Sequence, residues 1–586
     1  MMEIMNRITD KPEWEVKVFQ NEIIDKWRAE VLTMPDHDIS ERMFDWCISE
    51  LRYKTAAFKE SHCVEALDGV WKCDTVPNDL KIGLQKAVKV LEDVPPKDRD
   101  WHPSSNEQVL DLVHPSIYPL VYGQSRLLVD KTISIEDCLH QLGKGDICVL
   151  PEDQRTRLTS YINNLHPAKH QDLYRIIEKV VALAIPLWDL TLTPLAQLWN
   201  AEPRLTLEHN GYEYAERPEQ EEDEAAEAFN ERLQEWKDKY EEPEQRLVLP
   251  SQRTTPSTPT PPPLPSAPSP VPAAPAFPGP PPPPPPPLPS FRAPHPPPMP
   301  AMGDLEDDDE WLDRVEVWKA NRLIVQPEPK PFRPPMEDLQ EVWEPRLEKD
   351  PDFLTQGTVN LRKDFSKLQI IVKLANIHLT PEKPTYEGGS WHVEGMANES
   401  IVSTALYYYD CGNISESLLA FRQHVDCGTD LPYEQGDWRA CEVIYGIQNE
   451  GPTIQDLGKV VCKENRLLTF PNTMQHRVHP FHLADPTKPG HRKILALFLV
   501  DPHLRILSTA DVPPQQKSWW EEKVRGLGPL GPIPDEMTNH ILDLVDYPVS
   551  LETAKQQRLE LMEERKGFVK WQQEKFVQNT FSLCEH

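Results

Sequence analysis

The chain has 586 residues, enough for three or four average domains, and its 16 Trp, 16 Phe and 15 Tyr can supply a substantial core. Its formal net charge of −32 argues against a nucleic-acid partner, because a phosphate backbone requires a surface rich in Lys and Arg. The first residues are too polar for a signal peptide and no run of about 18 apolar residues occurs, so we expect an intracellular protein, cytoplasmic or nuclear, without a membrane partner.

Residues 1–214 are predicted to be mainly helical. Apolar residues recur at three- and four-residue spacing in 21–32 and in 173–187, which is typical of amphipathic helices. The segment 114–128 (HPSIYPLVYGQSRLL) is rich in Pro, Tyr and Gly, and we interpret it as a loop or a short strand. The ten cysteines include no C-x-x-C pair, which argues against a zinc finger.

Composition predicts that residues 215–310 form a disordered insertion. An acidic run at 219–227 precedes the proline-rich segment Pro256–Pro300, and a second acidic run follows at 303–311. Such a segment cannot bury enough apolar surface to offset the entropy of ordering. Its proline-rich part could bind SH3- or WW-type partners, or it could serve only as a spacer.

Residues 311–510 are predicted to be rich in strands. Five short aliphatic and aromatic runs, separated by turn residues, occur at 367–379, 403–410, 417–423, 466–472 and 493–501. Several short strands at nearly regular spacing favour an all-β sandwich or barrel. Residues 511–586 return to a helical pattern, with Ser550 as a predicted N-cap.

A histidine and a carboxylate two residues apart can bind one metal ion, because on a strand both point to the same face. Three such pairs occur, and roughly three are expected by chance. They are His170/Asp172, His392/Glu394 and His424/Asp426. The first lies in a helical pattern, where residues i and i+2 diverge. His392 and Glu394 follow a Gly-Gly turn within the strand region, which makes them the strongest candidates.

The third ligand is predicted to be His476. Together with His392 and Glu394 it would complete a 2-His-1-carboxylate set, which suits non-haem Fe(II) oxygenases. Arg492, which opens the next apolar run, could bind a carboxylate through its planar guanidinium. His479 is an alternative third ligand, although on a strand it would face away from His476.

These pieces resemble the core of the prolyl-hydroxylase type of Fe(II)/2-oxoglutarate-dependent dioxygenase. The resemblance rests on H-x-E at 392–394, TALYYYD at 404–410, and HRVHP at 476–480 followed by Arg492. It implies a double-stranded β-helix (jelly roll), Fe(II) bound by the two histidines and Glu394, and 2-oxoglutarate bound by Arg492 and Tyr408. Glu in place of the commoner Asp, and the long interval from His476 to Arg492, depart from the family's pattern.

Most of residues 60–520 also resembles a fungal family catalogued as domain of unknown function 4246. The resemblance is carried by HPSIYPLVYGQSRLL, SYINNLHPAKHQDLY, KLANIHLTPEKPTYEGGSWHVEGM and LADPTKPGHRKILALFLVDPH. It implies an α+β protein in which the N-terminal helices pack on the β-core as one unit, with residues 215–310 inserted.

The predicted function is therefore an Fe(II)- and 2-oxoglutarate-dependent oxygenase whose substrate, a small molecule or a protein, is not named by the sequence. Two alternatives remain open. One is a non-catalytic scaffold that combines a decayed oxygenase fold with the proline-rich segment. The other is a cupin-like metal enzyme that does not use 2-oxoglutarate and does not need Arg492.

Overall fold

The computed structural model describes residues 1–34, 39–128, 148–149, 156–197, 204–205, 212–214, 225–240, 247–248, 311–315, 322–335, 339–340, 343–425, 439–446, 448–525 and 533–582. The predicted disorder of Pro256–Pro300 lies outside these residues. Within the described part, no helix is long and apolar enough to cross a membrane.

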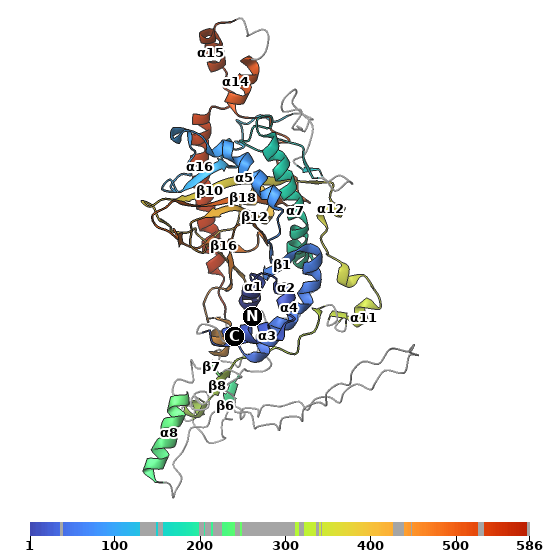
Figure 1. Ribbon diagram of the computed structural model, residues 1–586, viewed down its shortest axis with the longest axis vertical. Helices are drawn as coiled ribbons and strands as arrows, with labels where there is room; N and C mark the ends of the chain where they lie inside the picture. Colours follow the sequence, from blue (N-terminus) through green and yellow to red (C-terminus); the bar gives the residue numbers. More distant parts are fainter. Residues whose placement is uncertain are drawn as a thin grey trace.

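A seven-stranded antiparallel sheet forms the centre of the molecule (Figure 1). Its strands, in spatial order, are β1 (Cys63–Leu67), β2 (Val70–Cys73), β15 (Arg466–Pro471), β12 (Ile401–Gly412), β18 (Gly490–Val500), β10 (Ile370–Leu379) and β3 (Val109–Val113). The strands predicted at 367–379, 403–410, 466–472 and 493–501 are confirmed, because β10, β12, β15 and β18 cover them within a few residues.

Both faces of this sheet are buried, which explains why β12 and β18 appear as continuous apolar runs in the sequence. On β12, Tyr407 and Tyr409 join the cluster on one face, whereas Leu406 and Tyr408 join the cluster on the other. We call the second set the inner cluster; its buried members include Leu406, Tyr408, Leu419, Phe421, Leu468, Phe470, Ala496 and Phe498.

A smaller antiparallel sheet packs across the inner cluster. Its strands are, in spatial order, β14 (Ile454–Val461), β13 (Leu418–His424) and β16 (Gln475–Val478), and β11 (Thr385–Tyr386) pairs separately with β17 (Phe481–His482). The strand predicted at 417–423 corresponds to β13. The fold is thus a mixture of helices and antiparallel sheets, as predicted, with the inner cluster between the two larger sheets.

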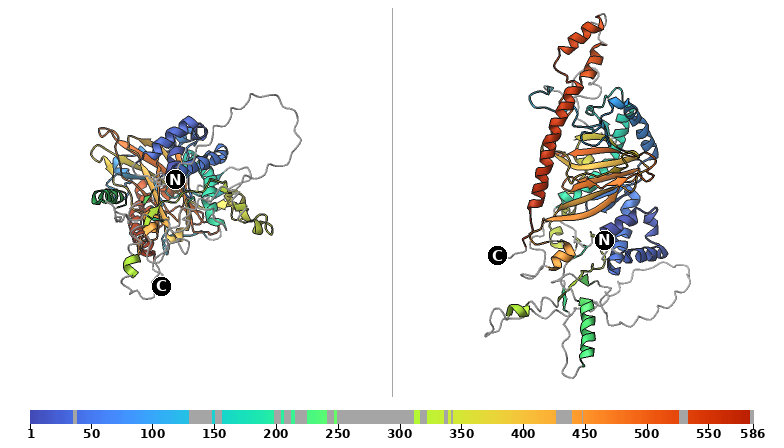
Figure 2. Two further views of the ribbon diagram at one scale, coloured as in Figure 1. Left: turned by 90° about the horizontal axis from the view of Figure 1, so that it is seen from below. Right: turned by 90° about the vertical axis from the view of Figure 1, so that its left-hand side faces the viewer.

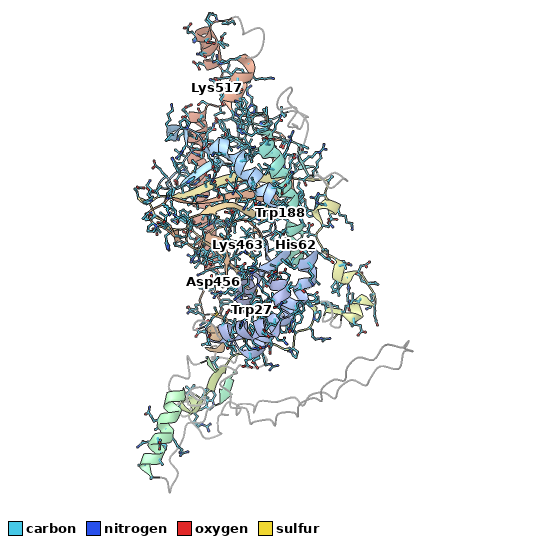
Figure 3. All side chains as sticks on the ribbon, in the orientation of Figure 1. Trp27, His62, Trp188, Asp456, Lys463 and Lys517 are labelled. Atoms are coloured by element: carbon cyan, nitrogen blue, oxygen red, sulfur yellow. The ribbon has the colours of Figure 1, made fainter. Side chains whose placement is uncertain are left out.

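Helices cover the opposite face of the large sheet. They are α5 (Asn78–Glu92) and α7 (Gln171–Ala196), and Trp188 of α7 is fully buried there (Figure 3). The N-terminal helices α1 (Met2–Thr9), α2 (Trp14–Lys17), α3 (Asn21–Leu32) and α4 (Glu41–Ser61) enclose a separate cluster that includes Trp27. The C-terminal helix α16 (Leu551–Gln578) runs along the side of the sheets (Figure 2). As predicted, Ser550 caps it, because Ser550 Oγ accepts a hydrogen bond from the Thr553 amide.

The N-terminal region is less purely helical than the periodicity predicted. β1, β2 and β3 all come from this region and extend the central sheet at both of its edges. A buried ion-pair network also joins it to the core, because Arg466 of β15 pairs with Asp10 and Asp74. Local patterns miss strands this short, because β2 and β3 pair with β15 and β10, hundreds of residues away, and β1 joins the sheet through β2.

The remaining elements are short or peripheral. They are β4 (Cys148–Val149), β5 (Arg157–Leu158), β6 (Tyr212–Tyr214), α8 (Ala226–Tyr240), β7 (Leu247–Val248), β8 (Arg322–Val325), α11 (Glu344–Leu347), α12 (Leu361–Asp364), β9 (Lys367–Leu368), α13 (Arg439–Tyr445), α14 (Lys517–Arg525) and α15 (Asp535–Asp543). Helix α8 lies within the segment predicted to be disordered. Its sequence, AEAFNERLQEWKDKY, is rich in strong helix formers, which the compositional argument overlooked.

Candidate metal centre

The loop between β11 and β12 carries His392 and Glu394, whereas β16 carries His476. The backbones of the two histidines exchange hydrogen bonds: the His392 amide donates to the His476 carbonyl (3.2 Å), and the His476 amide donates to the His392 carbonyl (2.9 Å). The Gly-Gly turn allows this close approach. Gly388 has φ +87°, and a Cβ atom there would lie 2.6 Å from the Val478 carbonyl oxygen.

We call His392, Glu394 and His476 the triad, because their potential ligand atoms all lie within 4.8 Å of one another. His476 Nε2 lies 3.4 Å from Glu394 Oε1, and the two imidazole centroids are 4.4 Å apart. Donor atoms on one face of a six-coordinate ion with bonds of about 2.1 Å lie about 3 Å apart. Small side-chain rotations would therefore bring the triad around one ion and leave its other face open.

The protonation states of His392 and Glu394 suit a metal ion. Burial and the neighbouring His476 lower the pKa of His392 to about 4. Burial alone would raise the pKa of Glu394, but its hydrogen bond to His476 and the nearby imidazoles outweigh that effect and lower the pKa to about 2. His392 Nδ1 lies 2.8 Å from the Ser390 carbonyl, which can only accept, so the proton is on Nδ1 and Nε2 presents its lone pair.

Neighbouring side chains fix the triad in place. The Asn472 side-chain amide accepts a hydrogen bond from the Glu394 amide (2.8 Å) and donates to the Glu394 carbonyl (2.9 Å). The His476 ring lies 4.7 Å from the Phe470 ring, measured between centroids, and next to Phe421. His476 Nδ1 is buried, and it has no hydrogen-bond partner within the described part of the chain.

Arg492 and Tyr408 lie on neighbouring strands beside the inner cluster. Arg492 is 3% exposed, and its guanidinium carbon lies 5.6 Å from the Tyr408 ring centroid and 5.2 Å from that of Phe481. Its Nη1 donates to Ser417 Oγ (2.7 Å), whereas its Nε has no hydrogen-bond partner, and no carboxylate of the described residues pairs with it. Tyr408 is buried, and its hydroxyl accepts a hydrogen bond from the Cys462 thiol (3.1 Å).

The other histidines considered from the sequence lie apart from the triad. His479 follows the end of β16, and among the described residues it belongs to no group of three potential ligands. His424 stacks on Phe576 with ring centroids 3.8 Å apart, and its sequence partner Asp426 lies outside the described residues. His170 is at the N-cap position of α7.

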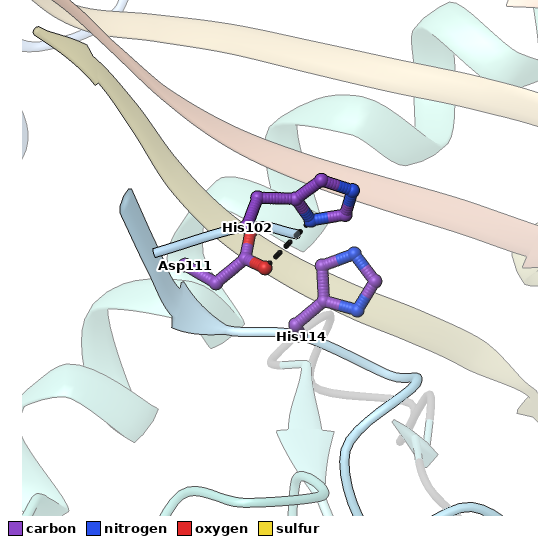
Figure 4. Close-up of side chains that lie close together, drawn as sticks. All are labelled: His102, Asp111 and His114. Carbon is purple, nitrogen blue, oxygen red and sulfur yellow. Dashed lines mark hydrogen bonds and ion pairs between the residues drawn. The ribbon is translucent and has the colours of Figure 1, made fainter. Parts of the chain in front are cut away.

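A second group of two histidines and one carboxylate was not anticipated from the sequence. His102, Asp111 and His114, here called the β3 cluster, also have potential ligand atoms within 4.8 Å of one another (Figure 4). His102 Nδ1 lies 2.8 Å from Asp111 Oδ2, and the two imidazole centroids are 5.3 Å apart. His102 belongs to the loop before β3 and His114 follows the strand, so no regular spacing marks the group.

Protons and cations surround the β3 cluster. The Ser116 amide donates to His114 Nδ1 (3.1 Å), so a neutral His114 carries its proton on Nε2 and has no free lone pair there. His102 Nδ1 donates to the Asp111 carboxylate, and Arg558 Nη1 lies 3.9 Å from the same oxygen. A divalent cation would have to displace these protons, and the positively charged Arg558 guanidinium would repel it. The β3 cluster is therefore better explained as a buried charge network.

The sequence matches a family model over residues 41–523, and a companion N-terminal model matches residues 1–30. The family is described as a protein of unknown function, DUF4246. The chain belongs to the DUF4246 family. A comparison of this DUF4246 protein with curated proteins finds no match.

Several solved structures are similar to small parts of this DUF4246 protein. TqaL, an Fe(II)/α-ketoglutarate-dependent dioxygenase, is 18% identical over 22% of this chain and 42% of its own, with a TM-score of 0.15. IDO from Bacillus thuringiensis is 13% identical over 27% of this chain and 56% of its own, with a TM-score of 0.15. EvdO2 from Micromonospora carbonacea var. aurantiaca, in complex with 2-oxoglutarate, is 11% identical over 28% of this chain and 65% of its own, with a TM-score of 0.13. The matched parts span less than two thirds of these proteins, and scores this low carry no argument about activity.

Proposed function

We propose that the protein is a non-haem Fe(II)- and 2-oxoglutarate-dependent oxygenase. His392, Glu394 and His476 would hold the metal, and Arg492 with Tyr408 would bind the distal carboxylate of 2-oxoglutarate. The observation that carries this proposal is that a metal-compatible triad and a buried arginine without an acidic partner border the same inner cluster.

The energetics of Arg492 favour an anionic ligand. A buried charge costs several kcal/mol unless it is paired and hydrogen-bonded. Ser417 satisfies only one of the Arg492 donors, and Nε has no partner among the described residues. A carboxylate that accepts from the guanidinium would offset this cost, since planar guanidinium groups bind carboxylates through two parallel hydrogen bonds.

The arrangement of strands supports the double-stranded β-helix expected from the resemblance. β10, β18, β12 and β15 lie side by side, and the β14–β13–β16 sheet faces them across the inner cluster. His476 is on the smaller sheet and Arg492 is on the larger one. We propose that these two sheets form the jelly-roll core, with the triad between them.

When bound, Fe(II) and 2-oxoglutarate would supply the activation of dioxygen. The chain's own residues would position the reactants and exclude water. Asn472 fixes the Glu394 backbone, and Phe470 and Phe421 pack against His476. The buried Tyr408 and Arg492 would orient the co-substrate.

The test is an anaerobic titration of the metal-free protein with Fe(II) and then with 2-oxoglutarate, followed through the visible charge-transfer band of the chelate. We expect the wild type to show the band, His392→Ala to lack it, and Arg492→Gln to require about 10- to 100-fold more 2-oxoglutarate, since a charge-assisted pair contributes about 1.5–3 kcal/mol. Circular dichroism checks that each variant is folded. A stoichiometric metal without any band would favour the cupin-like enzyme, and the absence of stoichiometric metal would favour the scaffold.

A further inference from the structure

A cavity of about 670 Å³ lies beside the start of β10, and its lining includes residues 396, 398 and 399 of the loop that carries His392 and Glu394. It is lined by the start of β10, by residues 115–122 and by one face of α16. Met396, only two residues after Glu394, lines it as well. Ile371 lines the cavity and also packs against the inner cluster, which contains Phe470, the aromatic neighbour of His476. Met396 and Ile371 thus link the wall of the cavity to the surroundings of the triad.

One wall of this cavity is the edge of a β-sheet. β3 pairs only with Leu374–Ile377 of β10, whereas Ile370–Lys373 pair with β18 on one side and, within the described residues, with no strand on the other. We call Ile370–Lys373 the edge segment. Four extended residues span about 13 Å, which is long enough to pair with a short peptide strand.

The backbone groups of the edge segment alternate in direction. The Gln369 carbonyl accepts from the Val500 amide on the β18 side, and the His378 amide donates to the Gln108 carbonyl on the β3 side. Because successive residues of a strand direct their hydrogen-bonding groups to opposite sides, those of Ile370 and Val372 point to the β3 side. Beyond the end of β3 this side is the cavity, which Ile370 and Val372 both line.

Another part of the cavity wall, formed mainly by α16, is acidic. The charged residues that line the cavity are Glu399, Glu560, Glu564 and Arg565. Arg565 pairs with Glu399 at 2.8 Å. Glu560 and Glu564 are exposed on one face of α16, and neither forms an ion pair within the described part of the chain. The unneutralised carboxylates favour a cationic ligand.

We propose that the cavity binds an extended, Lys- or Arg-containing segment of a protein substrate, which adds a strand to the edge segment and faces Glu560 and Glu564. Strand addition of this kind takes its affinity from main-chain hydrogen bonds and its specificity from flanking side chains. This inference rests on the proposed function, because the bound segment would present the side chain that is oxidised. A C–H bond of that side chain becomes C–OH; the second atom of dioxygen enters succinate, and 2-oxoglutarate loses carbon dioxide.

The experiment measures the fluorescence anisotropy of labelled octapeptides with the full-length protein, with and without Fe(II) and 2-oxoglutarate. The probes are an alternating Lys-Thr octapeptide, an alternating Glu-Thr octapeptide, and a Lys-Thr octapeptide that is N-methylated at alternate residues and so cannot donate along one edge. We expect only the first to bind well, and its binding to weaken as salt is added.

Two sets of variants locate the peptide. Val372→Pro removes the amide that points into the cavity and leaves the β18 side intact, and proline is tolerated at such an edge. The matched control Val372→Ala shortens the side chain but keeps the amide. We expect Val372→Pro to weaken binding about five- to ten-fold relative to Val372→Ala, the effect of one lost hydrogen bond. The double variant Glu560→Gln/Glu564→Gln should weaken binding of the Lys-Thr peptide and reduce its salt dependence.

The charge-transfer band, recorded on the same samples, separates this inference from the proposed function. An intact band with no peptide binding would overturn the strand-addition inference and leave the oxygenase in place. Peptide binding that is unaffected by both N-methylation and Val372→Pro would also overturn the strand-addition inference. If the peptide binds only after residues 249–310 are deleted, the chain's own insertion, rather than a substrate, occupies the edge segment.

Discussion

The triad and the β3 cluster contain the same residue types in nearly the same volume, yet their surroundings differ. In the triad, the Ser390 carbonyl accepts the proton of His392 Nδ1, so the lone pair of Nε2 faces the other ligands. In the β3 cluster, the Ser116 amide donates to His114 Nδ1, so an N–H group faces the cluster. The comparison teaches that residue types alone do not identify a metal ligand: the outer hydrogen bond of His392 leaves a lone pair on Nε2, whereas that of His114 leaves an N–H group there.

Charge reinforces this difference. Arg558 lies 3.9 Å from the Asp111 carboxylate and pairs with Asp100 through both Nη atoms. Around His476, the ring neighbours Phe470 and Phe421 are uncharged. A cation at the β3 cluster would be repelled by Arg558 at 3.9 Å, whereas Lys373 acts on both groups and helps to lower the pKa of Glu394.

The largest expected effect comes from removing a triad ligand. We expect His476→Ala to weaken Fe(II) binding by more than about 100-fold, because loss of a direct ligand should exceed the 10- to 100-fold effect of losing an outer partner. Anaerobic titration calorimetry measures the affinity. His479→Ala, three residues further along the chain, is the matched control and should bind like the wild type. The reverse result would make His479 the third ligand.

A smaller effect is expected at the outer partner of Glu394. Asn472→Ala removes hydrogen bonds that hold the Glu394 backbone and should weaken Fe(II) binding about 10- to 100-fold. Asn376→Ala is the control, because it removes a fully buried amide from the helix-covered face of the sheet. Equal Fe(II) affinities for the two variants would show that Asn472 acts only through general stability.

The pH dependence of metal binding provides a third test. The lowered pKa values of His392, about 4, and of Glu394, about 2, mean that protons on these two ligands do not compete with the metal near neutral pH. We expect these two groups to change the Co(II) affinity little between pH 7 and 5. Below about pH 4 the affinity should fall about tenfold per pH unit, because His392 takes up a proton. A Co(II) affinity that stays constant from pH 5 to pH 3 would contradict this arrangement.

The smallest effect on metal binding is expected at the β3 cluster. His102→Ala should leave the Fe(II) stoichiometry at one ion per chain and the affinity unchanged. It should lower the free energy of unfolding by about 1–3 kcal/mol, because the buried Asp111 carboxylate loses a hydrogen bond. Urea denaturation and metal analysis measure the two quantities. A second bound ion that disappears in His102→Ala would show that the β3 cluster is a metal site.

Much of the fold could be predicted from local patterns. The apolar runs of β10, β12, β15 and β18 and the Ser550 cap of α16 are encoded by neighbouring residues. The strands β1, β2 and β3 could not be predicted in the same way. Each is at most five residues long; β2 and β3 pair with strands far away in the sequence, and β1 joins the sheet through its neighbour β2.

For the site, the sequence by itself determined which residue types were available and that His392 and Glu394 follow a glycine turn. It favoured His392/Glu394 over two other H-x-[DE] pairs only through the surrounding pattern, and it gave no sign of the β3 cluster. The tertiary structure decided which groups converge, and it left Arg492 buried without an acidic partner among the described residues. The physical reason is that periodicity acts between neighbours along the chain, whereas hydrogen-bond polarity and burial depend on residues such as Asn472 that are brought in by folding.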